Sequence, residues 1–342
     1  MYSLGVWRRL TERLDRWAIQ QACSSVVTRH GNHHEREAEQ LLAEPDFFTD
    51  PVEPPRDLQF QNARDFSFKS QRPTPWASNS MVHGRLFKAG PDWQRRPAVI
   101  LLHGWNSESA YSRQFPYLAW RLNRHGVNAA MFELPFHGRR RPAGSAPINN
   151  FISHDLLSMI EATRQSLVDT RTIACWLLDQ GCPFVGVWGI SLGAWLAGLL
   201  ICTDLRIAFG VLLTPVPNVE AAVRELDFCA PIRAALQSHS LDVSRLNLAT
   251  LRPRIPAEDI LIIEATHDIF APPEIVEELW NSWERPPIWR VSHGHISILM
   301  SLRVFERTVQ WIAGTNRRLL RGARVSVPVR KDPAAVSGGA SR

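Results

Sequence analysis

One stretch decides the fold of this chain: residues 184–200 read FVGVWGISLGAWLAGLL. Its first five residues are apolar and rich in β-branched and aromatic side chains, which predicts a buried strand. From Ala194 onward the stretch is long and regular enough to form a helix. Ser191 lies between them with glycine two places away on each side, the spacing of a nucleophile elbow. We therefore expect a tight turn that holds the Ser191 hydroxyl above the sheet, at a helix N-terminus that favours negative charge.

The same stretch has a second interpretation, because residues 184–202 are uncharged and nearly long enough to span a bilayer. Four internal glycines, a serine and a clear change from strand to helix argue against a membrane span. These features favour an α/β segment that is buried on both faces.

Length and charge limit the classes of protein that fit. A chain of 342 residues can hold one large α/β domain or two small ones. The formal net charge is +6, but residues 317–342 alone carry seven basic side chains against one acidic one. The rest of the chain is therefore neutral, and we expect no nucleic-acid partner.

The cysteines and the N-terminus bear on the compartment. Five cysteines are scattered through the chain without a C-x-x-C pair, which indicates reduced thiols. The N-terminus begins with a charged stretch and not with the apolar segment of a secretory signal. We expect a cytoplasmic protein.

Residues 1–64 are expected to form an N-terminal helix and a proline-rich extension. Apolar residues recur at helical spacing over 4–21, with arginines elsewhere on the circumference. This helix either packs against its own domain or makes weak peripheral contact with an anionic membrane surface. Glu12 and Asp15 reduce its cationic character and favour packing. The histidines of residues 30–35 do not have the spacing of H-E-x-x-H, so we expect a solvated loop and no metal there.

The remaining chain alternates between strands and helices. Two leading strands, 66–68 and 81–87, are expected to be antiparallel. The buried strands that follow are predicted at residues 98–102, 127–133, 184–188, 207–213, 260–265 and 288–291, with a closing helix over 301–313. This order predicts a mostly parallel eight-stranded sheet with helices on both faces, within a domain over 65–315. Residues 316–342 are expected to form a basic, disordered tail.

Candidate partners for Ser191 follow the later strands. A serine hydroxyl becomes a good nucleophile only when a base takes its proton and a third group orients that base. Asp268 follows the strand 260–265, and His295 follows the strand 288–291. Glu264 is a weaker rival acid because it falls inside a strand, and His293 competes with His295. We prefer His295 because Gly294 permits a tight turn before it.

These motifs resemble those of α/β hydrolases over residues 65–315. The matching residues are His103-Gly104, Gly189-x-Ser191-x-Gly193, His267-Asp268 and Gly294-His295. The segment 133–142, ELPFHGRRRP, is similar to that of a poorly characterised branch of α/β-hydrolase-domain proteins. The resemblance implies the α/β-hydrolase fold and no cofactor.

The resemblance also implies a role for each matching residue. Ser191 would be the nucleophile, His295 the general base and Asp268 its orienting carboxylate. The backbone N–H groups of Leu192 and Trp105 would form the oxyanion hole. His103 is expected to be a structural, hydrogen-bonding histidine.

Two further segments bear on the substrate. Arg139 and Arg140 either hold an anionic part of a substrate or belong to a solvated or salt-bridged loop. Residues 216–259 are expected to form a small cap insertion with short helices over 221–226 and 232–236. The apolar residues of this insertion either line an acyl pocket or form the core of the cap.

The sequence thus favours a serine hydrolase that acts on a small-molecule carboxylic ester or thioester. An acyltransferase would use the same acyl-enzyme, with an alcohol, thiol or amine in place of water. A third hypothesis is a non-catalytic scaffold that binds a partner or a membrane surface through the N-terminal helix and the basic tail. The complete set of serine, acid and histidine counts against the scaffold.

Overall fold

The structure is a computed structural model that describes residues 2–23, 35–107, 109–143, 151–152, 155–226, 229–230, 233–234, 237 and 242–325. Within these residues lies a nine-stranded sheet of order β1-β2-β3-β5-β4-β6-β7-β8-β9. The strands are β1 (Gln59–Phe60), β2 (Asp65–Lys69), β3 (Met81–Phe87), β4 (Ala98–Leu102), β5 (Asn128–Phe132), β6 (Val185–Ile190), β7 (Ile207–Leu213), β8 (Ile260–Ala265) and β9 (Ile288–Val291). The sheet has one strand more than the eight expected, because the two-residue edge strand β1 pairs with β2.

The sheet is mostly parallel, as the sequence predicts. The pairs β1–β2, β2–β3 and β3–β5 are antiparallel, which confirms the two antiparallel leading strands. All pairs from β5 through to β9 are parallel. The carboxyl ends of these parallel strands therefore lie along one edge of the sheet, where α/β proteins place their sites.

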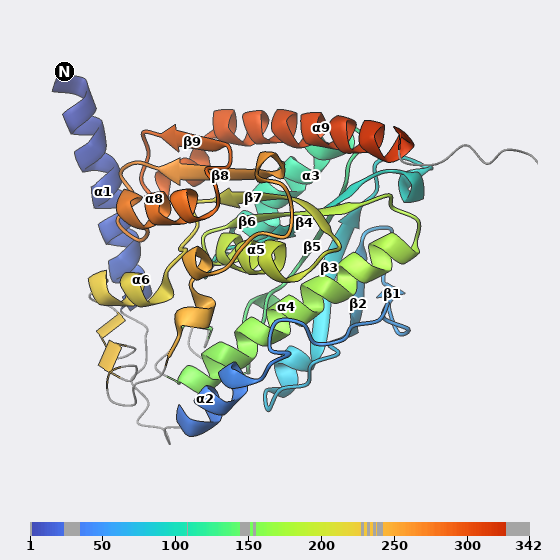
Figure 1. The fold of residues 1–342 in the computed structure, drawn as a ribbon, viewed down its shortest axis with the longest axis horizontal. Coiled ribbons are helices and arrows are strands. Elements are labelled where there is room, and N and C mark those ends of the chain that lie inside the picture. The colour runs from blue at the N-terminus through green and yellow to red at the C-terminus, as the bar shows by residue number, and fades with distance from the viewer. Residues whose placement is uncertain are drawn as a thin grey trace, which may run out of the picture.

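Helices cover both faces of the sheet. They are α1 (Tyr2–Cys23), α2 (Glu35–Ala43), α3 (Phe115–Asn123), α4 (Leu156–Asp179), α5 (Leu192–Thr203), α6 (Val219–Glu225), α8 (Pro273–Ser282) and α9 (Leu302–Val325). Figure 1 shows α3 and α9 on one side of the sheet and α4 and α5 on the other. Successive residues of β4 alternate between two apolar clusters, one with α4, α5 and α8 and the other with α3 and α9.

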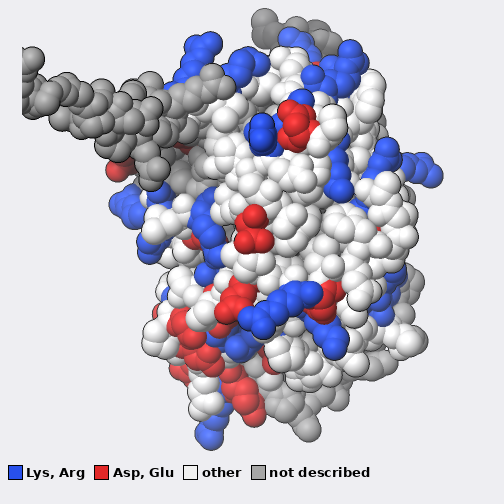
Figure 2. Space-filling view, turned by 90° about the vertical axis from the view of Figure 1, so that its right-hand side faces the viewer, with Lys and Arg blue, Asp and Glu red and all other residues white. Residues whose placement is uncertain are grey.

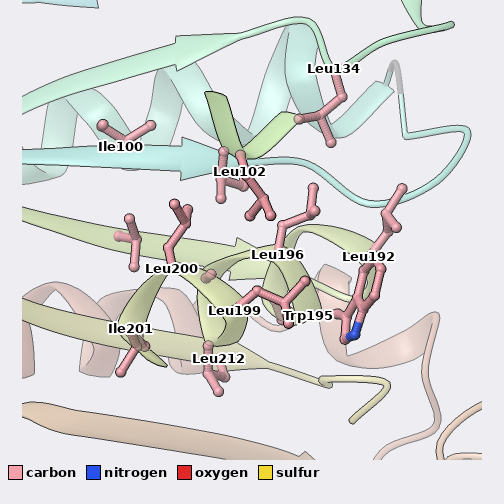
Figure 3. Close-up of a cluster of buried hydrophobic side chains, with 14 of the residues drawn as sticks. Ile100, Leu102, Leu134, Leu192, Trp195, Leu196, Leu199, Leu200, Ile201 and Leu212 are labelled. Atoms are coloured by element: carbon pink, nitrogen blue, oxygen red, sulfur yellow. The ribbon is translucent and has the colours of Figure 1, made fainter. Parts of the chain in front are cut away.

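Helix α5 is the centre of the larger cluster. Figure 3 shows Leu196 and Leu200 on the side of α5 that faces β4, while Leu199 points away from that strand. The opposite side is covered by the insertion, since Trp195 Nε1 donates a hydrogen bond of 2.8 Å to the Leu246 carbonyl oxygen. A helix that is apolar all round is buried all round. Residues 184–202 are thus a strand, a turn and a buried helix, and the membrane-span interpretation is wrong.

The closing helix is longer than expected, which corrects the domain end at 315. Helix α9 continues to Val325 because its buried face continues past Gly314: Thr315 and Asn316 are buried, and Leu319 packs against the core. Arg318 pairs with Asp259 at 2.6 Å. The first part of the expected basic tail is therefore helical, and residues 326–342 lie outside the described residues.

The insertion at 216–259 contains α6 and short 3-10 helices at Ser244–Leu246, Leu248–Thr250 and Ala257–Asp259. Helix α6 corresponds to the helix expected over 221–226. Of the second expected helix, 232–236, only residues 233–234 are described, so this expectation lies mostly outside the described residues.

The N-terminal extension packs onto the α/β domain. Figure 1 shows α1 standing across the end of the sheet to which the arrowheads of β8 and β9 point. Further along, Arg164 of α4 is buried and binds Asp50 at 2.6 Å and, by a short contact, Glu44. Helix α1 itself also contacts the domain, because Asp15 accepts hydrogen bonds from the backbone N–H groups of His295 and Ile296. The packing interpretation is therefore confirmed for this face of the N-terminal helix.

The surface carries charges of both signs. On the face drawn in Figure 2, basic and acidic groups lie among uncharged ones.

Across the described part of the chain, every helix is too short or too polar to cross a bilayer. The histidines at 30, 33 and 34 lie outside the described residues. Among the residues that are described, no three metal-ligating side chains form a cluster.

Candidate active site

Ser191 sits on the sharp turn between β6 and α5. Its φ of 52° and ψ of −114° are a strained conformation for a residue with a side chain. A methyl group at Gly189 would lie 2.1 Å from the Gly193 carbonyl oxygen, and one at Gly193 would lie 2.1 Å from that of Leu102. Only glycine fits at both positions, because any side chain would collide with these backbone atoms.

The structure brings Ser191, His295 and Asp268 together. The Ser191 hydroxyl donates to His295 Nε2 at 2.9 Å. His295 Nδ1–H donates to Asp268 Oδ2 at 2.6 Å. The other carboxylate oxygen, Oδ1, accepts from the backbone N–H groups of Phe270 and Ala271 at 2.8 and 2.9 Å. Asp268 is thus fixed by its own loop and holds the imidazole in the tautomer that leaves Nε2 free to accept the serine proton.

The two rival residues are engaged elsewhere. Glu264 is buried in β8 and pairs with Arg290 at 3.2 Å. His293 Nδ1 lies 3.2 Å from Ser297 Oγ, and its ring packs edge-on against Trp7. Both therefore have structural partners, and the contacts with Ser191 and Asp268 belong to His295.

The surroundings of His295 raise its pKa. Burial alone would lower the pKa of the imidazole, but the negative charge and hydrogen bond of Asp268, together with the charge of Asp15, raise it above its ordinary value. The Phe270 ring covers the His295 ring, with their centroids 4.6 Å apart. A buried base next to two carboxylates is suited to carry a proton during a reaction.

Two buried histidines hold the loop that follows β4. His103 Nδ1–H donates to the Gly104 carbonyl oxygen at 2.8 Å, and His103 Nε2 accepts from the Leu134 N–H at 3.0 Å. His137 Nε2 accepts from the Asn106 N–H at 3.2 Å. Burial lowers the pKa of His137 well below its ordinary value, so this ring is neutral. These bonds place His103 in the structural role that the sequence predicts for it, whereas no motif in the sequence predicts the role of His137.

That loop runs beside Ser191. A methyl group at Gly104 would lie 3.4 Å from the Ile190 carbonyl oxygen and 3.5 Å from Ser191 Cβ. The two expected oxyanion-hole donors are the next residue, Trp105, and the residue after Ser191, Leu192. Leu192 begins helix α5.

Arg140 is not a substrate-binding residue, and that expectation is wrong. Its side chain is fully buried and pairs with Asp169 of α4 at 2.8 Å. Its guanidinium also donates to the carbonyl oxygens of Glu133 and Asn79. A buried arginine needs such partners, and together they leave its charge inaccessible to a ligand. Arg139 is half-exposed and pairs with Glu133 at 3.1 Å, so its expected contact with an anionic substrate stays a prediction.

The site contains one acidic residue whose role the sequence did not reveal. Asp15 of α1 is fully buried and accepts hydrogen bonds from the backbone N–H groups of His295 and Ile296, at 2.8 and 3.0 Å. The helical spacing placed Asp15 among the charged residues of an amphipathic helix. No local signal sets Asp15 apart from those residues, since Arg8 and Glu12 lie on the same side of the helix.

A nine-stranded, mostly parallel sheet with helices on both faces and a serine on the turn after its central strand defines the α/β-hydrolase fold. The sequence profile described as "Alpha/beta hydrolase family" matches residues 99–335, which is more than half of the chain. The chain therefore belongs to the alpha/beta hydrolase family.

Similar curated proteins come from Mycobacterium tuberculosis. Two uncharacterized proteins, Rv2627c and MT2702, are each 26% identical to this chain over 253 residues. The match covers 70% of this chain and 59% of each relative, so the chain spans little more than half the length of these relatives.

Solved structures with the same fold include esterases. Acetyl xylan esterase 1 from Thermoanaerobacterium sp. has a TM-score of 0.55 at 18% identity, covering 86% of this chain and 98% of that chain. The Pyrococcus furiosus esterase Pf2001 has a TM-score of 0.51 at 15% identity, covering 84% and 96%. At such identities the likeness concerns the fold alone.

Proposed function

We propose that the protein is a serine hydrolase that cleaves a carboxylic ester or thioester through an acyl-enzyme on Ser191. One observation carries this proposal: an unbroken hydrogen-bond chain from Ser191 Oγ through His295 to Asp268. Membership of the alpha/beta hydrolase family supports a hydrolytic activity.

The geometry supports a two-step mechanism. Ser191 Oγ attacks the acyl carbon while its proton moves to His295 Nε2, and Asp268 stabilises the imidazolium that forms. His295 then gives this proton to the leaving alcohol or thiol, which leaves the acyl group on Ser191. In the second step water attacks the acyl carbon, its proton passes to His295, and the carboxylic acid leaves as Ser191 takes the proton back.

The oxyanion of each step would be held by two backbone N–H groups. We assign this role to Leu192, at the N-terminus of α5, and to Trp105, in the loop beside Ser191. The close approach of Gly104 to Ser191 supports the assignment of Trp105. A correctly placed donor of this kind stabilises the transition state by about 3 kcal/mol.

The substrate is expected to be a small acyl ester or thioester, with its acyl group near the insertion 216–259. This insertion packs on α5 through Leu246 and Leu248, and α5 begins directly after the nucleophile. Transfer to an alcohol, thiol or amine would pass through the same acyl-enzyme. Analysis of the products with and without an added alcohol distinguishes transfer from hydrolysis.

Hydrolysis of p-nitrophenyl esters of increasing chain length tests the proposal. The native protein should release p-nitrophenol with saturation kinetics, and Ser191→Ala should reduce kcat by at least about 10³-fold. Ser112→Ala is the matched control, because this hydroxyl is exposed and bonds only locally to the Ser109 carbonyl oxygen. Equal rates for the native protein and Ser191→Ala would refute the proposal.

A further inference from the structure

One face of α1 contacts the two loops that carry His295 and Asp268. Trp7 Nε1 donates to the Ser292 carbonyl oxygen at 2.7 Å, and Thr11 Oγ1 lies 3.0 Å from His267 Nδ1. Asp15 follows one turn later and binds the backbone at 295 and 296. Residues 7, 11 and 15 are spaced by four, so they share one face of the helix.

Asp15 makes the most specific of these contacts. Oδ2 accepts from the His295 N–H and Oδ1 accepts from the Ile296 N–H, so that one carboxylate satisfies two successive backbone donors. Burial raises the pKa of Asp15, while these two bonds and the nearby His295 act in the opposite direction. A carboxylate with hydrogen bonds to both oxygens is the form that such a pair of donors stabilises.

The glycine at position 294 is a second, independent indication that the Asp15 carboxylate belongs against this loop. A methyl group on Gly294 would lie 2.6 Å from Asp15 Oδ2, and the next two nearest atoms also belong to Asp15. Gly294 is absent from the described glycines with positive φ, which are Gly90, Gly126, Gly138 and Gly181. The expected reason for this glycine, a tight turn, is therefore replaced by another: it leaves space for the Asp15 carboxylate.

We propose that Asp15 is a positioning residue of the active site, which makes α1 an integral part of the catalytic machinery. The Asp15 carboxylate fixes the backbone of His295, so that the imidazole stays between Asp268 and Ser191. It also adds a negative charge next to an imidazole that becomes positive during the reaction. This inference rests on the proposed function, since it assigns a role in the reaction of Ser191.

Two charged groups, Asp268 and Asp15, face His295 from different elements. Asp268 comes from the loop after β8 and Asp15 from α1, and both raise the pKa of His295. Removing the Asp15 charge should therefore lower the pH at which His295 becomes a base, while loss of the backbone contact slows the reaction. A residue that merely supported the fold would change the melting temperature without moving this pH midpoint.

The test uses a fluorophosphonate probe with the full-length protein. Ser191 Oγ attacks phosphorus, the P–F bond breaks with loss of fluoride, and the serine proton passes to His295. The rate of labelling is measured against pH for the native protein, Asp15→Asn and Glu12→Gln. Glu12→Gln is the matched control, because it also removes a carboxylate from α1. The Glu12 carboxylate accepts from Arg8 and makes no hydrogen bond to the loop that carries His295.

Asp15→Asn should lower the plateau rate by about tenfold and move the midpoint down by roughly half a pH unit or more. Glu12→Gln should match the native protein in both. A rate and a midpoint for Asp15→Asn within error of the native values would overturn the inference and leave the proposed function intact. No labelling of the native protein would overturn the proposed function and this inference with it.

Gly294→Ala tests the same contact without removing the carboxylate, and it decides the matter if Asp15→Asn does not fold. The added methyl group must displace Asp15, so labelling should again slow by about tenfold. In an Asp15→Ala background that folds, Gly294→Ala should have little further effect, because the group it displaces is gone. Native-like labelling of Gly294→Ala would overturn the inference.

Discussion

At the scale of single residues, neighbours decide what each titratable group can do. His295 is buried, which opposes its charged form, yet Asp268 and Asp15 together raise its pKa above the ordinary value. His137 is also buried but has no carboxylate among the causes of its shift, and its pKa falls well below the ordinary value. The pKa of the same side chain is therefore raised beside carboxylates at one position, whereas at the other the ring is a neutral hydrogen-bond acceptor.

The first prediction concerns pH. In the proposed mechanism His295 must be neutral to accept the serine proton, so activity should fall as the pH decreases through the raised pKa of this residue. The acidic limb of kcat/KM should therefore have its midpoint above the ordinary histidine value of about 6.5. Initial rates with a neutral ester across the limb measure this midpoint, and a midpoint below the ordinary value would contradict the assignment of His295.

The second prediction separates Asp268 from its rival, Glu264. Asp268→Asn keeps the shape of the side chain but allows the wrong imidazole tautomer, and kcat should fall by about 10³- to 10⁴-fold. Glu264→Gln should leave kcat within about threefold, because its partner is Arg290 on the neighbouring strand. Steady-state kinetics of the two variants check this, and the reverse order of effects would exchange the two roles.

At the scale of elements, the elbow depends on how closely α5 approaches the strands around it. The peptide backbones meet at Gly189 and Gly193, where a methyl group would lie 2.1 Å from a carbonyl oxygen. The strained turn at Ser191 is maintained because β6 pairs with strands on both sides and α5 is buried on all sides. The rigid elements on either side thus hold the serine in place.

The third prediction follows from this close approach. Gly193→Ala should reduce the free energy of unfolding by about 3 kcal/mol, the upper end for overpacking, because its methyl group collides with backbone that cannot move aside. Gly314→Ala, in α9, is the control: nothing lies within 4 Å of the added methyl group, and the helix should gain about 0.5–1 kcal/mol. Thermal unfolding measures both, and a native-like melting temperature for Gly193→Ala would contradict the packing described.

At the scale of the whole molecule, the N-terminal extension and the α/β domain form one structure. The extension is held at two places. Helix α1 binds the loops after β8 and β9, and Asp50, in the segment after α2, pairs with Arg164 of the domain. Helix α1 also has an outer face with exposed Val6, Leu10 and Trp17. Exposed Arg9, Arg13 and Arg16 lie beside these apolar side chains.

The fourth prediction concerns this outer face. Arginines next to exposed apolar side chains complement an anionic lipid surface, so the protein should pellet with phosphatidylserine vesicles at low salt. Replacing Arg9, Arg13 and Arg16 by glutamine should abolish pelleting, whereas neutral phosphatidylcholine vesicles should retain little protein. Equal recovery in the supernatant with both lipids would end the peripheral-membrane hypothesis.

The sequence predicts features that depend on neighbouring residues and on strand order. The elbow lies within one continuous stretch, and Asp268 follows shortly after the buried strand β8. His295 follows β9, which is an edge strand and only half-buried, not fully buried as expected. Parallel strands bring these ends to one edge, so the site could be assembled without knowing any distance.

Features that depend on tertiary placement could not be predicted. Asp15 is 280 residues from the His295 N–H that it binds, and nothing in the local pattern of α1 identifies that partner. Arg140 belongs to a run of three arginines typical of a solvated loop, and only Asp169 on α4 explains its burial. Helix α9 continues past Gly314 because the core provides a surface for its last turns, which its local composition does not show.

The central claim is that Ser191 is an activated nucleophile, and the mass of the protein after exposure to a fluorophosphonate tests it most directly. The native protein and Ser112→Ala should each gain one phosphonyl group, which peptide mapping places on Ser191. Ser191→Ala should gain none. A native protein that stays unmodified, or that carries its adduct on a different residue, would contradict the account.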